Sequence, residues 1–217
     1  MTSHAQFYAD RIAIALRSLA PNGRLVPPEV PHINALAASF AQRAEAEAVA
    51  IVDPKWIEVA RSLIGQREIP GPRHNSWIAT GWARLGARWF NDDETPWCGF
   101  FVAHCLEAAG MPYPGRGEFA RALAWSSYGR GLQRAAVGAI GVKKRRGGGH
   151  VFFIIGETPD KRFFKVIEGN ANNMVRIGDV LKADVIAIRW PPADMIELPA
   201  SRILPVMDFG TIAETEA

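Results

Sequence analysis

Cysteine is scarce in this chain of 217 residues, which contains only Cys98 and Cys105. On one helix the two would lie about 10.5 Å apart, too far for a disulfide, so we expect two free thiols, as in proteins made in a reducing cytoplasm. The sequence has no apolar run of the about 18 residues that a membrane-spanning helix needs. It also lacks a basic stretch followed by a long apolar core near its start, which is the pattern of a secretory signal. We therefore expect synthesis in the cytoplasm without a signal peptide, and no transmembrane segment.

Two further patterns are missing. The sequence has no histidine, cysteine or carboxylate spacing typical of a metal site, and no glycine-rich phosphate loop follows a predicted strand. It shows no internal repeat. We expect neither a metal nor an organic cofactor.

Charge is distributed unevenly along the chain and suggests three parts. Residues 1–52 carry four basic and four acidic side chains, and helical spacing over 5–20 and 32–50 predicts a helical N-terminal extension. Residues 53–192 carry 20 basic and 13 acidic side chains, a balance of +7 that suits a polyanionic target. Residues 193–217 carry one basic and five acidic side chains and form an acidic C-terminal tail.

The order of predicted elements within 53–192 indicates an α+β domain. Three helices come first, near 55–64, 77–84 and 96–109, and a fourth is predicted over 118–127. The glycine-rich residues 128–149 read as a loop. About four strands then follow, starting at HVFFIIG, RFFKVIEGN, MVRIG and DVIAIRW, and the short turns between them predict a small antiparallel sheet packed against the helices.

Cys98 falls in the first turn of the third helix. Thr95 is the expected N-cap and Pro96 the first helical residue, while Gly110 ends the helix. A thiol at a helix N-terminus is stabilised as the thiolate by unpaired N–H groups and by the helix dipole, and the thiolate is the nucleophile. Cys105, in the middle of the apolar face, reads as a packing residue. Cys98 is therefore the candidate nucleophile.

A nucleophilic cysteine needs a base and a residue that orients the base. His150 opens the first strong strand directly after three glycines, and the next strand returns antiparallel to end in Ile167-Glu168-Gly169-Asn170. Glu168 and Asn170 share one face of that strand, and either could accept a hydrogen bond from the imidazole.

The motifs PWCGFFVAHCLEAAG, GGGHVFFIIGE and IEGN together resemble the NlpC/P60 and CHAP superfamily of papain-like cysteine peptidases, which hydrolyse bacterial cell walls. The resemblance covers about residues 53–192 and extends to a subfamily with an EIPG…HN segment, here Glu68–Gly71 and His74-Asn75. It departs from common members before the histidine, where they carry proline-glycine-aspartate and this chain carries glycine and basic residues.

The resemblance implies a papain-like fold with the cysteine helix packed on the sheet. It assigns the nucleophile to Cys98, the base to His150, and the third polar position to Asn170 or Glu168. The implied activity is cleavage of an amide bond in the cell-wall peptide of peptidoglycan through a thioester, by an endopeptidase or an N-acetylmuramoyl-L-alanine amidase. An endolysin-like protein without a signal peptide would reach the wall after lysis or by non-classical delivery.

Other interpretations stay open. The same superfamily contains acyltransferases, and a non-catalytic wall-binding or phage structural module could keep the fold. Trp97, Trp125 and Glu68 are candidate substrate contacts. Packing explains the two tryptophans equally well, and a role as a buried cap or ion-pair partner explains Glu68 equally well. The run Lys143, Lys144, Arg145 and Arg146 is a candidate contact for an anionic wall polymer, and nucleic acid is a less favoured partner.

Overall fold

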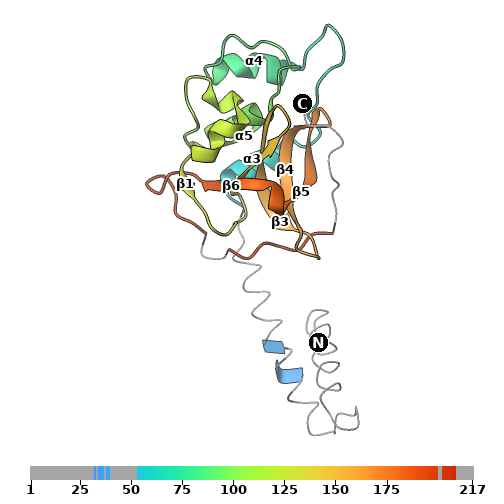
Figure 1. Ribbon diagram of the computed structural model, residues 1–217, viewed down its shortest axis with the longest axis vertical. Helices are drawn as coiled ribbons and strands as arrows, with labels where there is room; N and C mark the ends of the chain where they lie inside the picture. Colours follow the sequence, from blue (N-terminus) through green and yellow to red (C-terminus); the bar gives the residue numbers. More distant parts are fainter. Residues whose placement is uncertain (1–31, 33, 37, 40–52, 200–201, 209–217) are drawn as a thin grey trace. The chain divides into compact units, whose positions relative to one another are not determined.

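The computed structural model describes residues 32, 34–36, 38–39, 53–199 and 202–208 (Figure 1). The chain divides into two compact units, Met1–Val52 and Asp53–Ala217. In the first unit the described residues, all between 32 and 39, are helical, and the helix predicted over 5–20 lies outside the described residues. The acidic residues after 193 belong to the second unit.

The second unit has an α+β architecture, as predicted. Its helices are α3 (Lys55–Ser62), α4 (Ser76–Arg84) and α5 (Cys98–Ala108), which Figure 1 shows gathered beside the strands. Its six strands form one sheet in the order β1-β6-β2-β3-β4-β5, and every pairing in it is antiparallel. The strands are β1 (Arg130–Gly131), β2 (Ile140–Arg145), β3 (Gly148–Glu157), β4 (Phe163–Ala171), β5 (Met174–Leu181) and β6 (Val185–Trp190). In the described part of the chain, no helix is long and apolar enough to cross a membrane.

The prediction of a loop over 128–149 was wrong. That segment contains β1 and β2, and the basic residues Lys143, Lys144 and Arg145 lie on β2. The strand was hidden because only its first three residues are buried, so that the charged second half breaks the apolar pattern. The β2–β3 hairpin pairs Lys143 with His150 and Arg145 with Gly148.

The helix starts are held in different ways. Pro54 is the N-cap of α3 and makes no side-chain cap, while Asp53 pairs with Arg61 at 2.6 Å. Asn75 caps α4, where its side chain accepts a hydrogen bond from the Trp77 N–H at 2.9 Å. Residues 118–127 form two 3₁₀ turns, η1 (Glu118–Ala120) and η2 (Ala122–Ser127), in place of one α-helix.

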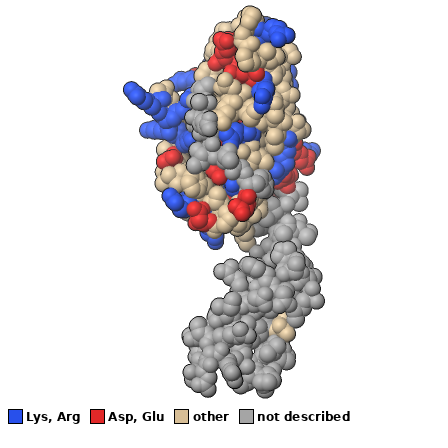
Figure 2. All heavy atoms as spheres, turned by 90° about the vertical axis from the view of Figure 1, so that its right-hand side faces the viewer, with Lys and Arg blue, Asp and Glu red and all other residues tan. Residues whose placement is uncertain are grey.

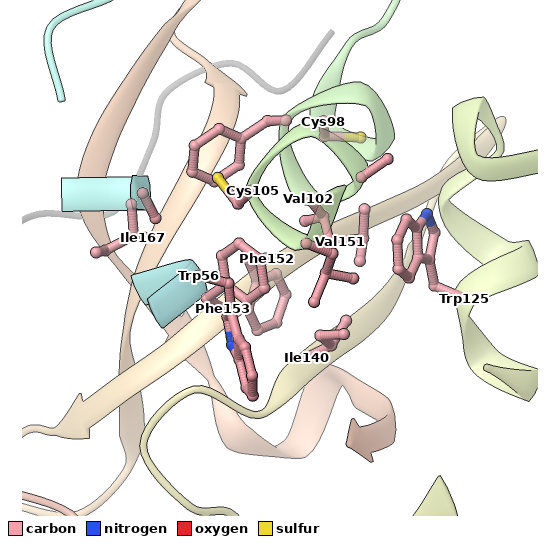
Figure 3. Close-up of a cluster of buried hydrophobic side chains, with 14 of the residues drawn as sticks. Trp56, Cys98, Val102, Cys105, Trp125, Ile140, Val151, Phe152, Phe153 and Ile167 are labelled. Carbon is pink, nitrogen blue, oxygen red and sulfur yellow. The ribbon is translucent and has the colours of Figure 1, made fainter. Parts of the chain in front are cut away.

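Helix α5 is the core of the unit. It packs on β3 and β4 as well as on α3, and it is buried almost all round, as expected for a helix that is apolar on every face. Figure 3 shows Cys98 at the end of this helix and Cys105 further along it, with Phe152 and Phe153 of β3 nearby. A glycine at position 169 lets β4 pack closely against α5, because a Cβ added there would lie only 2.5 Å from the Phe101 Cβ.

One buried carboxylate fixes the segment that precedes α5. Asp93 is fully buried and accepts hydrogen bonds from the N–H groups of Ile69 (2.9 Å) and Asn75 (2.7 Å) and from His74 Nδ1 (2.8 Å). It thereby joins the EIPG…HN segment to the residues that precede Cys98.

Replacing Asp93 with Ala should destabilise the protein by about 3 kcal/mol, because two backbone N–H groups and an imidazole lose a fully buried acceptor. Burial raises the pKa of Asp93, but the hydrogen bonds from Asn75, Ile69 and His74 outweigh it and lower that pKa, and the bond to Asp93 raises the pKa of His74. The carboxylate's contribution is lost as pH falls below about 4, and that of the imidazolium is lost as pH rises from about 6.5 through the raised pKa. Urea unfolding should therefore show the largest difference between pH 4 and 6.5.

Asp53→Ala is the matched control, because it removes a carboxylate whose ion pair with Arg61 is partly exposed. Its cost should stay within about 1 kcal/mol. Equal losses in the two variants would contradict the role given to Asp93.

Candidate active site

Cys98 is the first residue of α5. Trp97 is the N-cap and offers no side-chain cap, so the Thr95 and Pro96 capping prediction was wrong by two residues. Thr95 instead closes a turn in which its N–H donates to Asp92 Oδ1 at 2.6 Å. Cys98 thus lies nearer to the unpaired N–H groups of the helix end than expected, which favours the thiolate.

His150 lies beside Cys98 and contacts two partners. Its Nε2 is 3.0 Å from Glu168 Oε2, in a pair that is almost completely buried. The Cys98 thiol is its second partner and is close enough to change the pKa of the ring, although the buried Nδ1 has no well-aligned hydrogen bond among the described residues. The thiol, the imidazole and the carboxylate, from α5, β3 and β4, are therefore adjacent in one place.

The electrostatics of the pair favour charge separation. Burial raises the pKa of the Cys98 thiol, but the hydrogen bond and charge of His150, the Val151 N–H and the charge of Arg145 outweigh it and lower that pKa. Burial lowers the pKa of His150, but its hydrogen bonds to Cys98 and Glu168 raise it above its ordinary value. The pair is consequently shifted toward a thiolate and an imidazolium, which is the reactive form of such a pair.

The two candidates for the residue that orients the His150 ring differ in their contacts. Glu168 holds the ring through Oε2, whereas the Asn170 amide is buried and neither of its polar atoms has a hydrogen-bond partner among the described residues. Asn170 has a left-handed backbone (φ 59°), which asparagine tolerates better than most residues. The geometry therefore gives the orienting contact to Glu168.

The other described histidines of the second unit lie elsewhere. His74 is bound to Asp93, and His104 accepts a hydrogen bond from Trp77 Nε1 at 3.4 Å. Burial and the neighbouring Arg84 lower the pKa of His104 to about 4, so that it stays neutral at pH 7. Burial alone raises the pKa of the Cys105 thiol, which fits its reading as a packing residue.

The predicted substrate contacts are only partly accessible. Trp97 and Trp125 have no exposed surface, and their indole N–H groups donate to Glu68 Oε1 (2.8 Å) and to the Phe119 carbonyl (2.9 Å). Both rings are packed and unexposed in this conformation, as Cys98 and His150 are, so a substrate contact by either tryptophan stays a prediction. Glu68 lines an open hollow of about 380 Å³ that also includes Asp93 and Asn173.

Arg145 is a site residue that the sequence did not single out. Its Nε donates to the Gly149 carbonyl at 3.1 Å, one residue before His150, and its charge helps to lower the Cys98 pKa. In the sequence it was only one member of a basic run assigned to a loop. Recognising β2 would have placed it across the hairpin from Gly148 and so beside the site.

The site is closed in this structure. Cys98 is 2% exposed and His150 is fully buried. The segment made of η1 and η2 packs against the residues next to Cys98 and His150. A Cβ added at Gly99, which follows Cys98, would lie 2.0 Å from the Phe119 carbonyl oxygen. A Cβ added at Gly149, which precedes His150, would lie 2.6 Å from Leu123 Cδ2. A substrate that reacts with Cys98 would need this segment or the β2–β3 hairpin to move.

No group of histidine, cysteine and carboxylate side chains in the described residues could hold a metal ion. Comparison with known proteins gives no match to a family model, to a curated protein or to a solved structure. The case for a function therefore depends on the chemistry of the site itself.

Proposed function

We propose that the protein is a cysteine hydrolase that cleaves an amide bond in the cell-wall peptide of peptidoglycan. The observation that carries the proposal is the position of the His150 ring, which has Glu168 on one nitrogen and the Cys98 thiol as its second partner. The peptidoglycan substrate itself is inferred from the motif resemblance, with an endopeptidase and an N-acetylmuramoyl-L-alanine amidase as the two forms.

The mechanism follows from that arrangement. The Cys98 thiolate attacks the amide carbonyl, and an N–H group at the start of α5 stabilises the oxyanion. The His150 imidazolium gives its proton to the leaving amine, and the neutral ring then takes a proton from the water that hydrolyses the thioester. Glu168 holds the ring through its Oε2 throughout.

Cys98→Ala should abolish release of new amino groups from purified peptidoglycan, because no thioester can form. Mass analysis of the soluble fragments from the unchanged protein would identify the bond that is cleaved. Cys105→Ala, which removes a buried thiol from the same helix, should retain activity. Full activity in Cys98→Ala would rule out the assignment.

The main alternative within the same chemistry is acyl transfer, in which an amine or alcohol replaces water in the second step. Product analysis separates the two: free amine without transferred acyl group supports hydrolysis.

A wall-binding or phage structural module is the alternative from another class. It predicts an ordinary thiol pKa for Cys98, which iodoacetamide labelling across pH would detect.

A further inference from the structure

A second hollow lies at the opposite end of β3 from His150. It has a volume of about 390 Å³ and includes Glu157, the last residue of β3, which is seven residues or about 23 Å along the strand from His150. The hollow is therefore separate from the candidate active site.

Four cationic side chains from four segments meet at this hollow. Arg134 comes from the β1–β2 connection, Lys161 from the β3–β4 turn, Lys182 from the start of η3 (Lys182–Asp184), and Arg202 from the C-terminal segment. Glu157 is the only acidic residue of the described chain that lines the hollow.

The charges do not balance. Lys182 is neutralised, since its Nζ is 2.6 Å from Glu157 Oε2 and lies over the Phe164 ring at 4.9 Å. Within the described residues Arg134, Lys161 and Arg202 form no ion pair, and all three are exposed. Three positive charges around one hollow repel one another, and an anion bound between them would relieve that repulsion.

Part of the backbone around the hollow is held by hydrogen bonds. The Lys161 N–H donates to the Thr158 carbonyl at 2.9 Å, and the Lys182 N–H donates to the Arg162 carbonyl at 3.0 Å. The segment after Arg202 runs beside the end of β3, where the Glu157 N–H donates to the Pro205 carbonyl and the Met207 N–H donates to the Glu157 carbonyl, each at 2.9 Å. A site whose walls are already in place loses little freedom on binding.

We propose that this hollow binds a phosphate group of a phosphodiester polymer of the cell envelope. Arginine forks and lysine match the several oxygens of a phosphate, and the hollow's apolar lining from Ile188 and Leu204 suits the carbon links between phosphates. Phe164 is only 7% exposed, so no aromatic face is offered for base stacking, which argues against single-stranded nucleic acid. Figure 2 shows that basic side chains gather in patches separated by acidic ones on the face drawn, so a polyanion would bind locally and not over the whole surface.

The test is calorimetric titration with a short poly(glycerol phosphate), in a Cys98→Ala background so that catalysis plays no part. The triple variant Arg134→Gln, Lys161→Gln, Arg202→Gln should bind at least about tenfold more weakly, because three charge-assisted contacts are lost. A control with the same change of charge, Lys55→Gln, Arg73→Gln, Arg88→Gln, should bind as the parent does. All six residues are exposed, so both variants should keep the parent's thermal unfolding.

The β2–β3 hairpin, with its basic residues Lys144 and Arg146, is the alternative binding site for the polymer. The double variant Lys144→Gln, Arg146→Gln tests it. The proposal is overturned if that variant or the control loses as much affinity as the hollow variant, or if the parent does not bind the polymer. It is also overturned if polyglutamate or a DNA oligonucleotide binds the hollow more tightly. Inorganic phosphate should bind weakly and be displaced by the polymer. Because binding is the readout, the result is independent of whether Cys98 hydrolyses anything.

Discussion

Glu168→Gln is expected to slow amide hydrolysis about 10²- to 10⁴-fold, because the buried imidazolium of His150 loses the carboxylate that is 3.0 Å from its Nε2. The loss of that carboxylate lowers the His150 pKa and lets the Cys98 pKa rise toward its ordinary value. Labelling by iodoacetamide should then show its inflection at higher pH than in the unchanged protein. The pH shift distinguishes an effect on the pair from a general loss of structure.

Asn170→Gly is the informative comparison. Glycine accepts the left-handed backbone and removes an amide that forms no hydrogen bond with the described residues, so the inflection of the Cys98 labelling curve should not move. Glu157→Gln controls for the loss of a carboxylate at the far end of the sheet and should also leave the curve unchanged. If Asn170→Gly shifts the curve and Glu168→Gln does not, the orienting role belongs to Asn170.

Gly99→Ala is expected to destabilise the protein by roughly 1–3 kcal/mol, because the new Cβ would overlap the Phe119 carbonyl oxygen of η1 at 2.0 Å. Helix propensity alone predicts the opposite sign, since alanine is favoured over glycine by about 1 kcal/mol. The clash can be relieved only by displacing backbone, so the segment over Cys98 should loosen. Urea unfolding measures the first effect, and faster alkylation of Cys98 in the folded protein measures the second.

Gly148→Ala supplies the control, because no atom lies within 4 Å of its added Cβ and its backbone is not left-handed. It should change stability by no more than about 0.5 kcal/mol. If Gly99→Ala is as stable as its parent and Cys98 is alkylated at the same rate, η1 can shift to accommodate the added Cβ, and the prediction is wrong.

The sequence was sufficient for the parts of this structure that depend on local pattern. The apolar run after Cys98, the Asn75 side chain at the start of α4 and the continuous apolar run that follows His150 each specify an element through their own residues. The same patterns could bring Cys98, His150 and either Glu168 or Asn170 to one neighbourhood, because antiparallel return places the end of β4 beside the start of β3.

What the sequence could not give depends on contacts between distant segments. The choice of Glu168 over Asn170 is decided by the direction of a side chain at the irregular end of β4, where the pairing with β5 shifts register. Asp93 gave no sign of burial, because its three donors come from residues 18 to 24 positions earlier. β2 was missed because its charged half is a strand only through its partners β3 and β6.

The sheet order has a consequence for synthesis. β6 is the last strand to leave the ribosome, yet it lies between β1 and β2 and pairs with both. Until it arrives, a nascent chain would carry β2 as an open edge, with half of its hydrogen-bonding groups unused. Assembly of the sheet that carries His150 therefore cannot finish during translation of the preceding strands, and a truncated product would lack the ordered support that a reactive thiol requires.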